Sequence, residues 1–139
     1  MLENKKLLIL INNLNFFISH RLPIAQAAKL KGLDIVIGYG ELGGADNISL
    51  KKQGFKLTYI PINRGSINPF KELKTFLHIW KFLKSEKPDI THLVTIKPCL
   101  YGGIIARILN LPSVVIAVSG LGTLFISEEI KGKILRFFL

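Results

Sequence analysis

The sequence has a single cysteine, Cys99, among its 139 residues. One cysteine cannot form a disulfide within the chain, and no Cys/His spacing typical of a metal site accompanies it. A reducing compartment therefore suits the chain better than an oxidising one. No general base is evident for Cys99, so we predict neither a cysteine nucleophile nor a metal centre.

Long apolar runs are also missing. The longest, "SVVIAVSGLGTLFI", is interrupted by serine and glycine and falls short of the roughly 20 residues that a membrane-spanning helix needs. The N-terminal run "LLILI" is too short for the core of a signal peptide. These absences predict a cytoplasmic chain without a transmembrane segment.

Acidic residues are scarce. Nine Asp and Glu stand against 19 Lys and Arg, for a net charge of +10, and the mean hydropathy of +0.39 is high for a soluble domain. A positive field concentrates anions near the protein. No basic run with interleaved aromatics and no nucleic-acid module is present, which argues against nucleic acid. The partners that fit the charge are therefore an anionic membrane face and a phosphate-bearing substrate.

Short apolar runs alternate with amphipathic stretches along the whole chain, whose length suits one domain. This alternation predicts successive βαβ units: a Rossmann-like α/β domain whose parallel sheet carries helices on both faces in strand order 3-2-1-4-5. In the helix 70–87, a stripe at helical spacing predicts the buried face: Leu73, Phe76, Leu77, Trp80 and either Leu83 or Lys84. The predicted strands are 5–11, 33–39, 55–62, 89–96 and 112–119, with helices at 23–32, before Gly54, at 70–87, at 99–110 and from 127.

Four loops follow the carboxyl ends of predicted strands: "NLNFFISHR", "NRGSINP", "TIKPCLYGG" and "SGLGTLF". In this strand order the winding reverses between the first and fourth strands, and ligands of such sheets bind at that crevice. The loops at 12–20 and 95–99 are expected to face each other there. The four loops therefore predict the ligand site.

Within these loops, Ser19 is predicted to cap the next helix, with His20 and Arg21 in its first turn, where backbone N–H groups can receive an anion. A capped helix with solvated side chains is the alternative. Lys97 precedes a predicted helix whose positive dipole end disfavours a cation. Lys97 is therefore expected beside an anion, or else is an ordinary surface lysine.

Other candidate residues are less specific. Arg64 suits bidentate recognition of phosphate or carboxylate, and the glycines of "SGLG" permit close approach of a ligand, although no full GxGxxG motif is present. We interpret His92, within the fourth strand, as a hydrogen-bonded core histidine.

The segments "FFISHRLPIAQAAKLKG", "RGSINP", "PDITHLVTIKPCLYGG" and "VSGLGTLF", in this order, resemble the N-terminal half of family 4 (GT-B) glycosyltransferases that build bacterial O-antigen, capsule and exopolysaccharide. The resemblance implies half of a GT-B fold and retaining transfer of a sugar from a nucleotide-sugar, UDP-linked, without a metal or other cofactor. It also implies a polyprenyl-diphosphate-linked saccharide acceptor at the inner face of the cytoplasmic membrane, where the protein would be peripheral.

On this resemblance, His20 and Lys97 are assigned catalytic roles as positioned cations. Arg21 and Arg64 are expected to steer the acceptor diphosphate. One departure from the family pattern is Ile96, where relatives often have a histidine. The substrate-binding set is completed by residues of the same four loops: Ser19, Ser66, Thr95, Pro98, Tyr101, Ser119, Gly120 and Gly122.

The resemblance makes residues 1–139 an N-terminal glycosyltransferase 4-like domain, and the donor-binding domain with its E-x7-E carboxylates is absent. The chain is then an incomplete enzyme, inactive alone, whose missing half is a further domain or a partner subunit. An alternative is a non-catalytic membrane-docking subunit of a bipartite glycosyltransferase. A third is a stand-alone nucleotide-binding Rossmann domain.

Overall fold

The computed structural model describes residues 2–63 and 65–119. Its centre is a five-stranded sheet in the order β3-β2-β1-β4-β5, with every neighbouring pair parallel. The predicted fold class and strand order are confirmed. The strands are β1 (Lys6–Asn13), β2 (Asp34–Glu41), β3 (Lys56–Tyr59), β4 (Ile90–Val94) and β5 (Ser113–Ala117).

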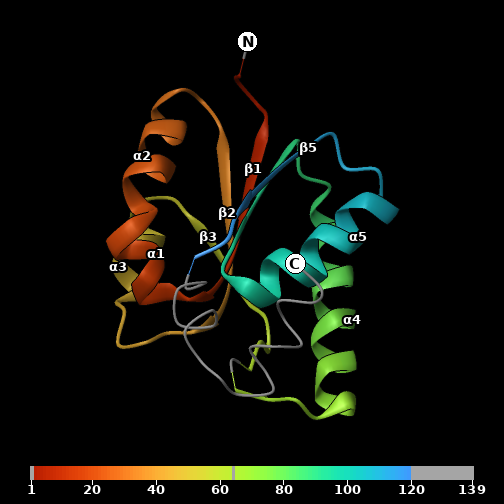
Figure 1. Cartoon of the computed structure of the whole chain (residues 1–139). Helices are drawn as coiled ribbons and strands as arrows, with labels where there is room; N and C mark the ends of the chain where they lie inside the picture. Colours follow the sequence, from red (N-terminus) through yellow and green to blue (C-terminus); the bar gives the residue numbers. More distant parts are fainter. Residues whose placement is uncertain (1, 64, 120–139) are drawn as a thin grey trace.

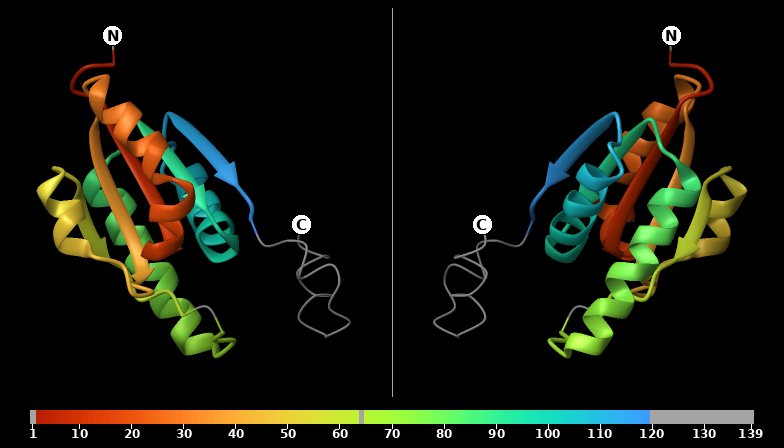
Figure 2. Two further views of the ribbon diagram at one scale, coloured as in Figure 1. Left: turned by 90° about the vertical axis from the view of Figure 1, so that its left-hand side faces the viewer. Right: turned by 90° about the vertical axis from the view of Figure 1, so that its right-hand side faces the viewer.

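Helices cover both faces of the sheet (Figure 1). α1, α2 and α3 lie on one face, and α4, the π-helical turn η1 and α5 lie on the other. Viewed from the side in Figure 2, α4 begins beyond the carboxyl ends of the strands. The helices are α1 (Leu14–His20), α2 (Leu22–Leu30), α3 (Asn47–Lys52), α4 (Pro69–Glu86), η1 (Pro98–Gly102) and α5 (Gly103–Ile108).

The core consists of two apolar layers separated by the sheet. Successive side chains of a strand point to opposite faces, so Ile9 and Ile11 of β1 pack under α1 and α2, whereas Leu8 and Leu10 pack under α4. All four are fully buried. Burial on both faces explains why the strand predicted at 5–11 is a continuous apolar run.

The segment 14–20, expected as a polar loop, is helix α1. Asn13 caps it, because its side-chain oxygen accepts a hydrogen bond from the Phe16 N–H at 3.2 Å. Leu14 and Phe17 are fully buried and secure the helix to the sheet. The prediction that Ser19 is an N-cap is therefore wrong: Ser19 lies in the last turn of α1.

The predicted buried stripe of α4 is also wrong in part. The buried residues of α4 are Thr75, Ile79, Phe82 and Leu83, while Leu73 and Leu77 are 57% and 49% exposed. Apolar residues occur at helical spacing on more than one side of this helix. Their spacing alone therefore does not identify the side that packs against the sheet. An apolar strip of α4 consequently stays on the surface.

Candidate functional site

The loops after β1 and β4 meet at the carboxyl end of the sheet, as predicted for the point where the winding reverses. The Asn12 N–H donates to Thr95 Oγ1 at 3.4 Å, and the Thr95 hydroxyl donates to the Val94 carbonyl. Thr95 has a φ of +72°, which is strained for a β-branched residue. Backbone strain held by surrounding hydrogen bonds is typical of functional sites.

The turn η1 follows this loop directly and is packed tightly against β4. A Cβ on Gly102 would lie 2.7 Å from Leu93 Cδ2, so only glycine fits there without displacing Leu93. Pro98 and Cys99 are buried, and burial raises the pKa of the Cys99 thiol to about 11. Cys99 is a structural residue here, and η1 gives the β4 loop a fixed base.

Lys97 is held by several partners from other segments. Its Nζ donates to Glu72 Oε1 at 2.7 Å, to the Ser66 carbonyl at 2.9 Å and to the Asn63 carbonyl. The Lys97 and Glu72 side chains are only 19% and 18% exposed. Lys97 therefore fastens the loop after β3 and the start of α4 to the loop after β4.

Tyr101 completes this cluster from η1. Its hydroxyl donates to Glu72 Oε2, and its ring meets Phe76 edge-on, with ring centroids 6.0 Å apart. Burial raises the pKa of Tyr101, and the hydrogen bond and charge of Glu72 raise it further. The phenol stays protonated at neutral pH and acts as a donor to the carboxylate.

The anion that the sequence predicted beside Lys97 is thus present within the chain as the Glu72 carboxylate. Glu72 was not predicted from the sequence, since it lies 25 residues from Lys97 and 29 from Tyr101. Its one local signal was an acidic side chain in the first turn of a predicted helix, which the helix dipole alone accounts for. Contact of Lys97 with a substrate stays a prediction.

At the end of α1, Ser19 and His20 form a second group. Ser19 Oγ lies 3.1 Å from the Asn15 carbonyl and 2.7 Å from His20 Nδ1, and the His20 ring stacks on Phe16 with 4.1 Å between centroids. When the hydroxyl donates to Asn15, His20 Nδ1–H donates to Ser19 and Nε2 carries the lone pair. This arrangement orients an exposed imidazole that can accept or donate a proton.

Arg21 joins α1 to α2, and its Nη1 donates to the His20 carbonyl at 3.4 Å. Arg21 Nε is buried and has no hydrogen-bond partner in the described part of the chain, and the same holds for His92 Nε2. Burial lowers the pKa of His92, and the charge of Arg21 lowers it further. The interpretation of His92 as a hydrogen-bonded core residue is therefore wrong for this nitrogen.

The remaining predicted residues are only partly described. Ser66 Oγ accepts the Asn68 N–H at 3.3 Å near the start of α4, and Ser119 follows β5 with a buried hydroxyl that has no partner among residues 2–63 and 65–119. Three further site residues, as well as the helix expected from 127, lie outside the described residues: Arg64, Gly120 and Gly122. The contact between Asn12 and Thr95 links the strands that lead to the Ser19–His20 group and to the Lys97–Glu72–Tyr101 cluster.

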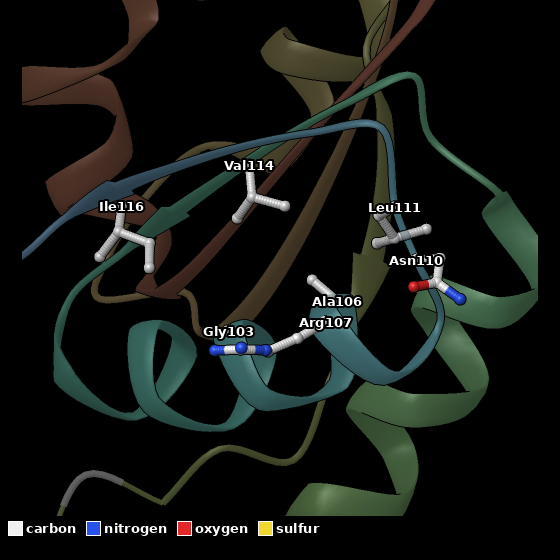
Figure 3. A pocket seen from close by; sticks show the side chains of 7 residues that line it. All are labelled: Gly103, Ala106, Arg107, Asn110, Leu111, Val114 and Ile116. Carbon is white, nitrogen blue, oxygen red and sulfur yellow. The ribbon is translucent and has the colours of Figure 1, made fainter.

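A groove of about 380 Å³ lies elsewhere, between α5 and the edge strand β5 (Figure 3). Its lining is both apolar and polar, with Ala106, Val114 and Ile116 on the one hand and Arg107 and Asn110 on the other. Of its lining residues, Gly103 belongs to the predicted loop 95–103, and the others lie outside the four predicted loops.

Within the described ranges, no helix is long and apolar enough to cross a bilayer. The same ranges contain no group of three or more His, Cys, Asp or Glu side chains that could hold a metal ion.

The parallel sheet in the order β3-β2-β1-β4-β5, with polar loops at its carboxyl end, is the architecture expected for half of a GT-B fold. Residues 6–138 match the family model described as Glycosyl transferase 4-like, and the chain belongs to this family.

Two curated relatives carry related names. The chain is 30% identical over 90 residues to N,N'-diacetylbacillosaminyl-diphospho-undecaprenol alpha-1,3-N-acetylgalactosaminyltransferase of Campylobacter jejuni, a match that covers 65% of this chain and 24% of that protein. It is 35% identical over 75 residues to UDP-Gal:alpha-D-GlcNAc-diphosphoundecaprenol alpha-1,3-galactosyltransferase of Escherichia coli, covering 54% of this chain and 18% of the relative. The matched part of the chain thus spans about a quarter or less of either relative.

Among solved structures, Acinetobacter baumannii MurG is similar in fold, with a TM-score of 0.64 and 24% identity over 84% of this chain and 35% of MurG. The matched region therefore corresponds to about a third of that chain.

Proposed function

We propose that this chain is the acceptor-side domain of a glycosyltransferase that moves a sugar from a nucleotide-sugar to a polyprenyl-diphosphate-linked saccharide at the membrane surface. Both curated relatives are named for acting on saccharides linked to undecaprenol through diphosphate. The reaction is expected to be retaining and to use a UDP-linked donor. Donor binding falls to a further domain or a partner subunit.

The observation that carries this proposal is the exposed surface of α4, which begins at the same end of the sheet as the candidate site (Figure 2). Phe70 is 84% exposed, and Leu73 and Leu77 continue its row at helical spacing. Lysines flank this row on the same side of the helix: Lys74, Lys81 and Lys84, all exposed. Apolar side chains flanked by cations are typical of a helix that lies in an anionic lipid interface.

In this arrangement the lipid anchor of the acceptor and the protein share one membrane surface. The diphosphate would then reach the carboxyl end of the sheet, where His20 and Arg21 supply cationic or hydrogen-bonding groups. Beside this end of the sheet, the contacts of Lys97 hold the loops after β3 and β4 in fixed positions relative to each other. Lys97 thus has a positioning role through Glu72 in addition to the catalytic role predicted from the sequence.

Membrane docking is tested by flotation with vesicles that contain about 30% anionic phospholipid, compared with neutral vesicles. We expect Phe70→Ser to reduce the bound fraction at least fivefold, since a buried aromatic contributes roughly 1.5–3 kcal/mol. Leu30→Ser is the matched control, because Leu30 is 90% exposed on α2. Equal losses from both variants, or undiminished binding by Phe70→Ser, would contradict docking through α4.

The electrostatic part has its own test. Lys74→Glu with Lys81→Glu should abolish flotation with anionic vesicles at low salt, since each lysine near such a surface contributes about 1 kcal/mol. Lys31→Glu, which changes an exposed lysine after α2, serves as control. Binding by the double variant at the wild-type level would exclude charge attraction at this face.

Activity is tested with the chain alone and then with a donor-binding domain of a relative. We expect no transfer from a UDP-sugar to a polyprenyl-diphosphate saccharide by the chain alone, and transfer when the second domain is added. Transfer by residues 1–139 alone would refute the assignment as an acceptor-side half.

A further inference from the structure

Arg21 occupies an unusual environment for an arginine. It is half-buried between α1 and α2, its Nε has no partner in the described part of the chain, and none of the described carboxylates lies within ion-pair distance of it. Its guanidinium makes one long hydrogen bond, to the His20 carbonyl. Because a buried N–H group requires a compensating acceptor, the Nε of Arg21 points to an anion.

His92 lies on the same side of the sheet as Arg21. It is opposite Ile9 of β1 and Val115 of β5 in the strand register, and Ile9 packs in the apolar layer under α1 and α2. His92 Nε2 is buried without a partner among the described residues. A neutral imidazole and a guanidinium therefore lie near each other, each with an unused nitrogen.

We propose that Arg21 and His92 form a binding site for one phosphate group on the α1/α2 side of the sheet, between the end of α1 and the middle of β4. A phosphate oxygen accepts from a guanidinium and an imidazole alike, and one anion satisfies both groups. A metal cation is excluded by the adjacent guanidinium charge. This phosphate site adds detail to the proposed function. It rests on that function only for the identity of the phosphorylated ligand.

The first test follows the His92 ring nitrogens by NMR in the full 139-residue chain while pyrophosphate is added. We expect the His92 signals to move with saturation, because the anion contacts Nε2, and those of His78 to stay unchanged. His78 is a suitable internal reference, since it is exposed on α4 and its Nδ1 contacts the Lys74 carbonyl. His92 signals that stay fixed while pyrophosphate binds elsewhere would overturn the site.

Calorimetry with variants gives the second test. Arg21→Met should weaken pyrophosphate binding at least tenfold, whereas Arg107→Met, which removes the same charge from an exposed position on α5, should change it less than twofold. His92→Phe should also weaken binding severalfold. Equal effects of the two arginine variants would show a general charge effect and overturn the proposal.

The source of the phosphate is resolved by repeating the titration with farnesyl diphosphate and with UDP. Stronger binding of farnesyl diphosphate than of UDP, lost in Arg21→Met, supports a lipid-linked acceptor. Preference for UDP at the same residues would leave the phosphate site intact and contradict the proposed acceptor role. If the affinity for farnesyl diphosphate is unchanged in both Arg21→Met and His92→Phe, the phosphate site is overturned and the proposed acceptor role stands.

Discussion

The two ends of the sheet are built differently. At the amino end, Glu86 at the close of α4 accepts from Lys6 at 3.0 Å and from Lys56 at 2.7 Å, and the Lys6 N–H donates to Asp89 at 2.8 Å. Charges there are paired between neighbouring elements. Toward the carboxyl end, Arg21 after α1 and His92 within β4 have nitrogens without a partner among the described residues, and Thr95 is strained.

This difference indicates a division between stability and function. Polar groups that hold elements together are satisfied within the chain, and unsatisfied buried groups persist where a ligand can complete them. The Lys97–Glu72–Tyr101 cluster is the exception at the carboxyl end, since its ion pair and hydrogen bonds resemble those of the amino end. It keeps the functional loops fixed while the neighbouring groups stay available.

The largest effect on stability is expected from disrupting the Lys97–Glu72–Tyr101 cluster. Glu72→Gln leaves the mostly buried Lys97 ammonium without its carboxylate, which should cost about 3 kcal/mol of the free energy of unfolding. Urea denaturation at pH 7 measures the loss.

Glu72→Gln combined with Lys97→Met is the control, because removing both charges should restore more than half of the lost stability. A double variant no more stable than the single one would show that Glu72 does not act through Lys97.

A smaller effect is expected at the amino end. Burial alone would raise the pKa of Glu86, but the hydrogen bonds and charges of Lys56 and Lys6 outweigh it and lower the pKa below its usual 4.5. Because the unfolded chain then binds this proton more readily, the contribution of Glu86 is complete above about pH 5 and is lost as the pH falls through the lowered pKa.

Glu86→Gln should therefore cost about 1–2 kcal/mol at pH 7 and reduce the fall in stability between about pH 5 and pH 3. Chemical denaturation across that range measures both. Glu41→Gln serves as control, since Glu41 is exposed at the end of β2. A pH profile of Glu86→Gln parallel to the wild type would contradict the assigned ion pairs.

The sheet could be predicted from the sequence, because apolar runs such as 5–11 and helix-ending residues such as Gly54 are local signals. Helix α1 was missed since Asn12 and Asn13 read as loop residues, although Asn13 is its cap. The Glu72 contacts and the unused nitrogens of Arg21 and His92 depend on elements brought together by folding. Such pairings have no local pattern in one sequence.

The smallest effect compares two left-handed residues at opposite ends of the sheet. Lys87 ends α4 with a φ of +46°, and Thr95 follows β4 with a φ of +72°. Lys87→Gly should raise the free energy of unfolding by about 0.5–1 kcal/mol, because glycine carries no Cβ penalty there, and should leave pyrophosphate binding unchanged. Thermal denaturation and calorimetry measure the two quantities.

Thr95→Gly relieves a similar strain but also removes the oxygen that accepts the Asn12 N–H, so the net change in stability should be close to zero. If the strain at the carboxyl end keeps the β1 and β4 loops in place for a ligand, Thr95→Gly should weaken pyrophosphate binding about threefold or more. A gain in stability equal to that of Lys87→Gly, with binding unchanged, would show that the strain at Thr95 has no part in the site and that the two ends differ less than proposed.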